Sequence, residues 1–146
     1  MKIYVASSWR NLIQQDIVKL LRAAGHDVYD FRNPAPGNHG FAWSEVNPDW
    51  KQWTPEEFIE DLYSGHSAIK RGFAFDRDAL EACDMCVLVL HCGRSAHLEA
   101  GYAAGMGKKV IFYLTPDNFE PELMYLLGDA CVTTPKQLLV AVGNGG

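Results

Sequence analysis

Short apolar runs alternate along this chain with segments whose apolar residues recur at helical spacing. Runs rich in β-branched and aromatic residues predict strands, whereas apolar residues three and four positions apart predict helices. The expected strands are Lys2 to Ala6, Asp27 to Phe31, Met85 to Leu90, Lys109 to Leu114 and Ala130 to Thr133. The expected helices are Asn11 to Ala24, Ala74 to Cys83, Ala96 to Met106, Glu120 to Leu127 and Pro135 to Val142. In the first of these, Leu12, Ile13, Ile17, Leu20 and Leu21 form the apolar stripe, and Gly25 ends the helix.

This alternation predicts an α/β fold, a doubly wound parallel sheet with helices on both faces. Right-handed crossovers leave few topologies, and we expect the flavodoxin-like strand order 2-1-3-4-5. The chain of 146 residues is long enough for one domain with a real core, so residues 1–146 are predicted to form a single domain. Ligands bind where the strand order reverses, which here lies between the first and third strands.

The segment from Asn33 to Gly72 departs from the pattern because it is rich in Pro, Gly and Trp. Thr54 and Pro55 predict one short helix start inside it. The rest reads as a long inserted loop, and such loops often act as lids or binding loops. Its three tryptophans either offer flat surfaces to a ring-shaped ligand or pack the loop onto the domain: Trp43, Trp50 and Trp53.

Composition excludes several classes of function. The net charge is -5 and no basic tract occurs, so binding to a nucleic acid polymer is not expected. No apolar stretch approaches the length of a membrane span, and the first strand begins at Lys2, which leaves no room for a signal sequence. We therefore expect a cytoplasmic protein.

The cysteines and histidines do not predict a metal site. Cys83 and Cys86 form a C-x-x-C pair, but no second pair accompanies them, so we interpret them as small core residues. The five histidines lack the spacing of paired ligands, and no glycine-rich phosphate loop of the dinucleotide kind occurs. We expect no metal and no cofactor.

The candidate chemistry lies in the stretch Cys92 to Tyr102, which follows the third strand. Glu99 is expected in the first turn of the following helix, where the helix dipole favours an ionised carboxylate. A carboxylate at the carboxyl end of a parallel strand is a candidate nucleophile, although an acid in a first turn also serves as a simple helix cap. The neighbouring loops, Ser7 to Arg10 and His91 to His97, are rich in hydroxyls and donors, and each carries an arginine suited to an anionic ligand.

Three features together resemble the nucleoside 2-deoxyribosyltransferase family, which includes deoxynucleoside 5'-monophosphate N-glycosidases. They are the strand and loop Ile3 to Trp9, the aspartate Asp76 eight residues before Asp84, and the Glu-x-Gly-Tyr-Ala helix at Glu99. The resemblance covers the sheet and leaves the Trp-rich segment unmatched. It implies cleavage or exchange of the N-glycosidic bond of nucleosides or their 5'-monophosphates.

The resemblance also implies roles for individual residues. Glu99 matches the nucleophile that forms a covalent glycosyl-enzyme, Asp76 the acid that protonates the departing base, and Tyr4 a tyrosine near the nucleophile. Asp78 is an alternative to Asp76, and both aspartates have a simpler interpretation as caps of a helix start. Ser7 and Arg10 match a loop that contacts sugar or phosphate, and Ser8 and Trp9 belong to the same loop. Family members are generally dimers or larger, so a homo-oligomer is expected. Gly101 and Gly105 form a smooth helix stripe that permits close packing.

One position departs from the transferases. They carry an acid six residues before the nucleophile, where this chain has Gly93, followed by Arg94, Ser95 and His97 as candidate substrate contacts. Donors at a helix N-terminus favour a phosphate. Three alternatives stay open: a transferase, a 5'-monophosphate N-glycosidase that only hydrolyses, and a non-catalytic sensor domain on the same fold.

Overall fold

The computed structural model describes residues 1–143, and the chain divides into two compact units. The first unit combines Met1–Asp30 with the chain from Ala79 onward, and the second is Phe31–Asp78. The prediction of a single domain over the whole chain stays a prediction, and one cooperative unfolding transition is its expected signature.

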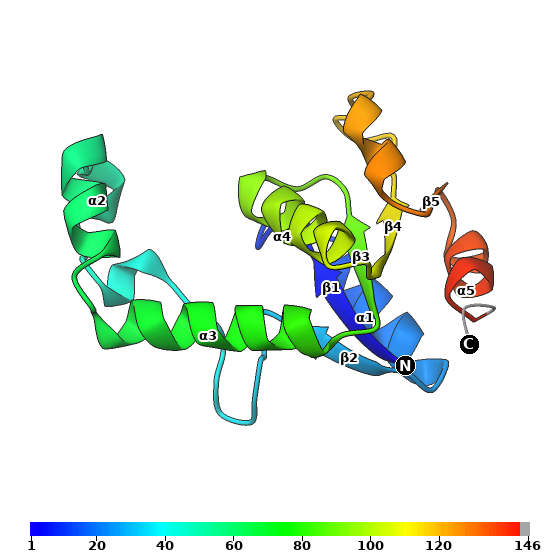
Figure 1. Ribbon diagram of the computed structural model, residues 1–146, viewed down its shortest axis with the longest axis horizontal. Coiled ribbons are helices and arrows are strands. Elements are labelled where there is room, and N and C mark those ends of the chain that lie inside the picture. The colour runs from blue at the N-terminus through cyan, green and yellow to red at the C-terminus, as the bar shows by residue number, and fades with distance from the viewer. Residues whose placement is uncertain (144–146) are drawn as a thin grey trace. The chain divides into compact units, whose positions relative to one another are not determined.

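The first unit contains a five-stranded sheet in which every neighbouring pair is parallel. The strand order is β2-β1-β3-β4-β5, which confirms the order predicted from the sequence. The strands are β1 (Lys2–Ala6), β2 (Asp27–Asp30), β3 (Met85–Val89), β4 (Lys109–Tyr113) and β5 (Ala130–Val132). The sheet is flanked by α1 (Gln14–Ala23), α4 (Arg94–Gly105) and α5 (Pro135–Gly143), as Figure 1 shows.

Strand alternation divides the core into two layers, one on each face of the sheet. Ile3, Val5 and Val87 pack with the apolar residues of α1 and α5, including Leu21 and Leu138. The other layer holds the strand side chains that point to the opposite face, which are Tyr4, Ala6, Cys86 and Leu88. The helix α4 covers this layer with Ala96, Ala100 and Ala103. β3 is buried along its whole length, as expected for a central strand covered on both faces.

The first helix begins later than its apolar pattern predicts. α1 starts at Gln14 instead of Asn11, and Leu12 is 94% exposed instead of lying in the core. The Asn11 side chain explains the difference, because its Oδ1 accepts from the Ile13 N–H and its Nδ2 donates to the His91 carbonyl. These two bonds favour a turn over the first helical residues.

The connection between β4 and β5 contains a 3-10 helix, η3 (Leu123–Leu127), instead of the predicted helix from Glu120. The Glu122 side chain caps it by accepting from the Met124 N–H. Gly128 follows directly, and a Cβ there would lie 2.4 Å from Cε2 of Phe112 and 3.0 Å from the Val110 carbonyl. Only glycine permits η3 to approach β4 so closely.

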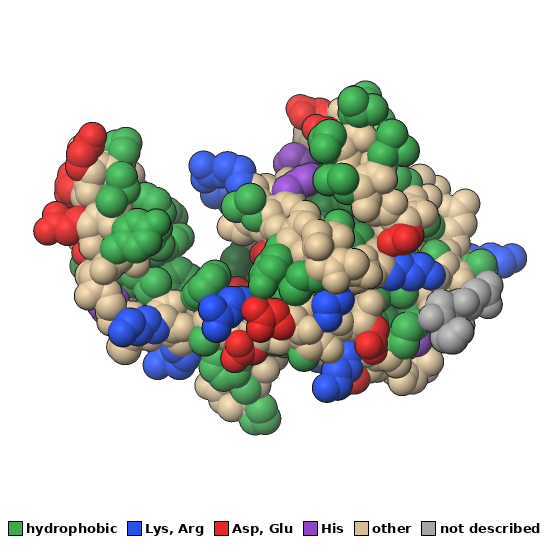
Figure 2. Space-filling view, viewed as in Figure 1, with side chains coloured by type: hydrophobic (Ala, Val, Ile, Leu, Met, Phe, Trp, Pro, Cys, Tyr) green, Lys and Arg blue, Asp and Glu red, His purple; other side chains and the backbone are tan. Residues whose placement is uncertain are grey.

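Several large apolar side chains on η3 are exposed, and Figure 2 shows hydrophobic side chains gathered over that element. Leu123 is 75% exposed and Leu126 is 83% exposed. Contiguous exposed apolar side chains of this kind commonly mark an interaction surface.

The second unit replaces the predicted long loop with ordered helices. It contains the 3-10 helices η1 (Trp43–Glu45) and η2 (Trp50–Gln52), the helix α2 (Pro55–Leu62) and most of α3 (Ser67–Ala82). Thr54 caps α2 as predicted, in a capping box with Glu57. α3 begins at Ser67, seven residues before the predicted start at Ala74.

Two of the three tryptophans pack against other aromatic rings of this unit. Trp43 lies edge-on to Phe41, Trp53 and Phe58, with ring centroids 4.8 to 5.7 Å apart. A Cβ at Gly72 would lie 3.0 Å from the Phe41 side chain, so glycine in the middle of α3 lets that ring pack against the helix. Trp43 and Trp53 therefore belong to a half-buried aromatic cluster of the unit, whereas Trp50 carries Lys51 over its ring.

In the part of the chain that the structure describes, no helix combines the length and apolarity needed to cross a membrane.

Cys83 and Cys86 lie in the core layer beneath α4, and the Cys83 thiol donates to the Leu80 carbonyl.

Candidate active site

The carboxyl ends of β1 and β3 lie side by side, and the two candidate loops meet there. The Ser7 hydroxyl donates to the Val89 carbonyl over 2.8 Å, and Asn11 Nδ2 donates to the His91 carbonyl over 3.0 Å. The first bond is buried and the second is exposed. These bonds join the loop after β1 to the loop after β3 at the reversal of strand order.

Glu99 contacts Tyr4, the middle residue of β1, and its carboxylate oxygen Oε2 accepts a hydrogen bond from the Tyr4 hydroxyl. Tyr4 is fully buried in β1, and its ring stacks on Tyr29 with centroids 5.0 Å apart and planes 18° from parallel. Tyr29 was not a sequence candidate, because only the register of β1 against β2 shows that the two rings are neighbours.

The prediction that Glu99 lies in the first turn of its helix is wrong. α4 begins at Arg94, so Glu99 is its sixth residue and no acid occupies the first turn. The helix dipole acts mainly within the first turn. The sequence analysis expected the helix N-terminus to favour the ionised form of Glu99. In the structure it is the Tyr4 hydroxyl that donates directly to this carboxylate.

The start of α4 itself offers backbone donors. Gly93 is the N-cap residue, no side chain caps the helix, and a Cβ at Gly93 would meet nothing within 4 Å. Arg94 and Ser95 are exposed in the first turn. First-turn N–H groups and an arginine, with no acid among them, form a suitable environment for an anion.

His97 points away from Glu99. The two residues are two positions apart on α4, which places them about 200° apart around the helix. Nδ1 of His97 lies 2.8 Å from the Gly93 carbonyl, and Nε2 lies 3.0 Å from the Tyr125 hydroxyl. Because a carbonyl only accepts, Nδ1 carries a proton and donates to Gly93, and Nε2 forms the second hydrogen bond with the Tyr125 hydroxyl. Tyr125 was not a sequence candidate either.

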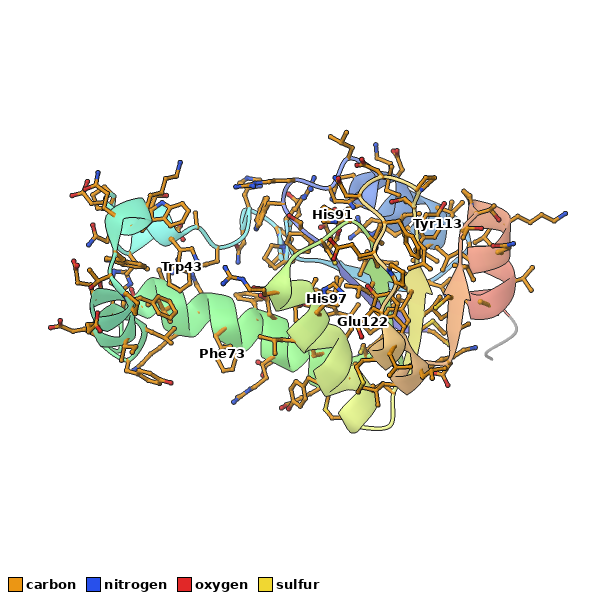
Figure 3. All side chains as sticks on the ribbon, turned by 90° about the horizontal axis from the view of Figure 1, so that it is seen from above. Trp43, Phe73, His91, His97, Tyr113 and Glu122 are labelled. Atoms are coloured by element: carbon orange, nitrogen blue, oxygen red, sulfur yellow. The ribbon has the colours of Figure 1, made fainter. Side chains whose placement is uncertain are left out.

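A cavity of about 130 Å³ lies on the His97 side of the loop after β3. His91, His97 and Tyr125 line it together with acidic residues of the β4–β5 connection, including Glu122, and Figure 3 labels His91, His97 and Glu122. Neither Tyr4 nor Glu99 lines this cavity, so it is separate from the Tyr4–Glu99 pair.

Cys92 is buried at the same place, with its sulfur 3.7 Å from Nδ1 of His97. Burial, with a smaller contribution from the negative charge of Glu99, raises the pKa of the Cys92 thiol from 9.0 to about 12. The thiol is therefore protonated at neutral pH and does not act as a nucleophile there.

The loop after β1 divides into a structural half and an exposed half. Ser7 is buried and held by the Val89 carbonyl, whereas Ser8 accepts from the Arg10 N–H over 3.2 Å. Trp9 is 51% exposed and Arg10 is also exposed. The exposed side chains of this loop are therefore those of Trp9 and Arg10.

Asp76 and Asp78 both lie on α3, within the second unit. Because α3 begins at Ser67, neither aspartate caps its start, and that interpretation is wrong. Two positions apart, they lie on different sides of the helix, and Asp76 is half-buried while Asp78 is exposed. The difference in burial favours Asp76 over Asp78 as a functional carboxylate, and its acid role stays a prediction.

Among the described residues, no group of three or more His, Cys, Asp or Glu side chains is placed to hold a metal ion.

No family model matches the sequence, and no curated protein matches it.

Solved structures match nearly the whole chain. A 2-deoxyribosyltransferase from Bacillus psychrosaccharolyticus is 19% identical with a TM-score of 0.59, covering 94% of this chain and 90% of its own. The chain has the fold of a nucleoside 2-deoxyribosyltransferase. The CMP N-glycosidase BcmB of Clostridium botulinum is 16% identical with a TM-score of 0.52, covering 98% of this chain and 99% of its own. A conserved protein from Enterococcus faecalis V583 is 16% identical with a TM-score of 0.60, covering 99% and 98%.

These matches confirm the predicted resemblance at the level of the fold. Two of the three similar structures are, by name, enzymes of glycosidic bonds, one a transferase and one an N-glycosidase.

Proposed function

We propose that this protein is an enzyme that cleaves or exchanges the N-glycosidic bond of a nucleoside or its 5'-monophosphate. The observation that carries the proposal is the hydrogen bond from the buried Tyr4 of β1 to the Glu99 carboxylate of α4, the helix that follows β3. A carboxylate held in one orientation is suited to attack an anomeric carbon, and α4 begins at the edge of the sheet where ligands bind in this fold.

The proposed reaction has two halves. In the first, a Glu99 oxygen forms a bond to C1' while the bond from C1' to the base nitrogen breaks, and Asp76 gives its proton to that nitrogen. In the second, water or another base attacks C1', gives its proton to Asp76, and releases the Glu99 carboxylate. Water as the attacking group gives hydrolysis, and a base gives transfer.

Tyr4 contributes to both halves through its hydrogen bond to Glu99. It restrains the carboxylate before attack, which lowers the entropy that the reaction must lose. It also stabilises the carboxylate that leaves C1' in the second half, because a donor to an ionised acceptor is stronger than a neutral hydrogen bond.

The start of α4 supports a phosphate on the substrate. The uncapped helix N-terminus at Gly93 and the exposed Arg94 and Ser95 are proposed to hold a 5'-phosphate, with Arg10 and Trp9 contributing from the loop after β1. Backbone amides and arginine are the groups that favour phosphate oxygens.

The decisive experiment incubates the protein with deoxyuridine or its 5'-monophosphate, each with and without adenine, and separates the products by chromatography. Free uracil alone indicates hydrolysis, and a deoxyadenosine product indicates transfer. Glu99→Gln is expected to abolish both, because losing a covalent step removes several kcal/mol of transition-state stabilisation. Glu60→Gln, at an exposed position of α2, is the matched control.

A Glu99→Gln protein with more than about a tenth of the wild-type rate would remove Glu99 from the nucleophile role. No turnover of any nucleoside or nucleotide by the wild-type protein would favour the sensor alternative.

The phosphate assignment has its own test, which is binding to the inactive Glu99→Gln protein by calorimetry. The 5'-monophosphate is expected to bind more tightly than the nucleoside, and Arg94→Ala is expected to remove most of that difference. Equal affinities in the parent protein would favour an unphosphorylated substrate.

A further inference from the structure

Both ring nitrogens of His97 are engaged within the chain. One contacts the Gly93 carbonyl at 2.8 Å and the other the Tyr125 hydroxyl at 3.0 Å, and the imidazole also stacks on the Tyr125 ring at 15°. A ring fixed at both nitrogens and on one face is poorly placed to donate to a ligand.

Tyr125 is itself fixed against the sheet. Its ring stacks on Phe112 of β4, with centroids 4.3 Å apart and planes 23° from parallel. Gly128 allows this approach, because a Cβ there would overlap the Phe112 ring. A continuous set of contacts therefore leads from β4 through Tyr125 and His97 to the Gly93 carbonyl.

Gly93 needs such an anchor. It is the N-cap of α4, and it has no side chain that could hydrogen-bond to the helix. Glycine also loses more conformational freedom on ordering than any other residue. The loop is held at His91 by Asn11 and at Gly93 by His97, and these two bonds fix the residues that lead into α4.

We propose that His97 is a positioning residue, which holds the Gly93 carbonyl and thereby orients the first-turn N–H groups of α4 toward a substrate phosphate. Tyr125 orients His97 from the opposite side. The inference rests on the proposed function for its ligand, but the anchoring of the loop is a property of the free protein.

Two amide substitutions separate the two nitrogens of the ring. In His97→Asn the side-chain amide lies near the place of Nδ1 and retains a donor to Gly93. In His97→Gln the amide reaches the place of Nε2, which retains the contact with Tyr125 and loses the one with Gly93. Both substitutions remove the imidazole, so each serves as the control for the other.

The first measurement is hydrogen–deuterium exchange of the segment from residue 91 to residue 96 in the free protein. His97→Gln is expected to accelerate exchange there by about fivefold or more, as the loss of one hydrogen bond allows, and His97→Asn is expected to stay near wild type. Equal exchange in the two variants would overturn the positioning role, whatever the protein's activity.

The second measurement is calorimetric binding of a deoxynucleoside and its 5'-monophosphate, with both substitutions placed in the Glu99→Gln protein. His97→Gln is expected to weaken the 5'-monophosphate by about fivefold or more and to leave the nucleoside unchanged, and His97→Asn is expected to restore binding. The reverse order, with Gln tolerated and Asn impaired, would show Nε2 donating directly to the ligand and overturn the inference. If the parent protein binds neither compound, the proposed function fails, and the exchange measurement still decides the role of His97.

Discussion

The hydrogen bond from Tyr4 to Glu99 can be removed with little change in packing, by Tyr4→Phe. The phenylalanine ring keeps the volume of the fully buried side chain and its stack on Tyr29. Only the hydroxyl that donates to the Glu99 carboxylate is lost. A hydrogen bond to a charged group contributes about 1.5 to 3 kcal/mol. At about 1.4 kcal/mol for each factor of ten, turnover is expected to fall by about 10- to 150-fold.

The assay is steady-state turnover of the best substrate, with kcat and KM determined separately. The loss is expected in kcat, because Tyr4 contacts the proposed nucleophile and the effect belongs to the transition state. Tyr113→Phe is the matched control, since Tyr113 is a buried tyrosine of β4 in the opposite core layer (Figure 3). A Tyr4→Phe protein that keeps its full kcat would refute the argument that Tyr4 holds the nucleophile. An equal loss in Tyr113→Phe would assign the effect to core packing.

Three further predictions concern other parts of the chain. Asp76→Asn is expected to lower turnover by about a hundredfold for a poor leaving-group base and much less for an activated one, whereas Asp78→Asn changes neither rate; the opposite result would exchange their roles. The protein is expected to be at least a homodimer by light scattering, and Gly101→Leu to dissociate it, because Gly101 and Gly105 are exposed with open space around them; a monomeric wild-type mass would contradict this. The free energy of unfolding is expected to fall as the pH rises from 9.0 to about 12, because the Cys92 thiol ionises at a lower pH in the unfolded chain than in the folded protein. Denaturant unfolding at several pH values should show a shallower fall for Cys92→Ala than for the wild-type protein.

The sheet and its order could be predicted because strand signals in this chain are local. The five apolar runs are short and well separated, and the crossover rule then leaves few orders. The strand bounds differ from the predicted ones by one residue at most, always at the carboxyl end.

The first residues of the helices were harder to predict than the strands, because contacts between residues distant in the sequence decide where a helix begins. α1 starts three residues late since Asn11 bonds to His91, a partner eighty residues away. α3 starts seven residues early, because Gly72 serves a close contact with Phe41 instead of ending an element. α4 starts two residues early at a glycine cap, which carries no side-chain signal.

In the candidate site, too, some residues could be predicted from the sequence, whereas others depend on contacts between distant residues. The resemblance selected Tyr4 and Glu99, and the structure brings them into contact. Tyr29 and Tyr125 escaped the sequence analysis because a tyrosine in an apolar segment reads as core. Tyr29 contacts Tyr4 and Tyr125 contacts His97, and only the fold brings these pairs together.

The tight approach at Gly128 has a consequence for how this protein tolerates mutation. Even alanine there would force the Phe112 ring to move, and Phe112 supports the ring of Tyr125. A mutational scan would therefore find an intolerant position at the edge of the sheet, in a residue that has no side chain and is remote in sequence from Glu99. Engineering of this scaffold should therefore leave Gly128 unchanged and can instead vary exposed side chains such as those of Trp9 and Arg10.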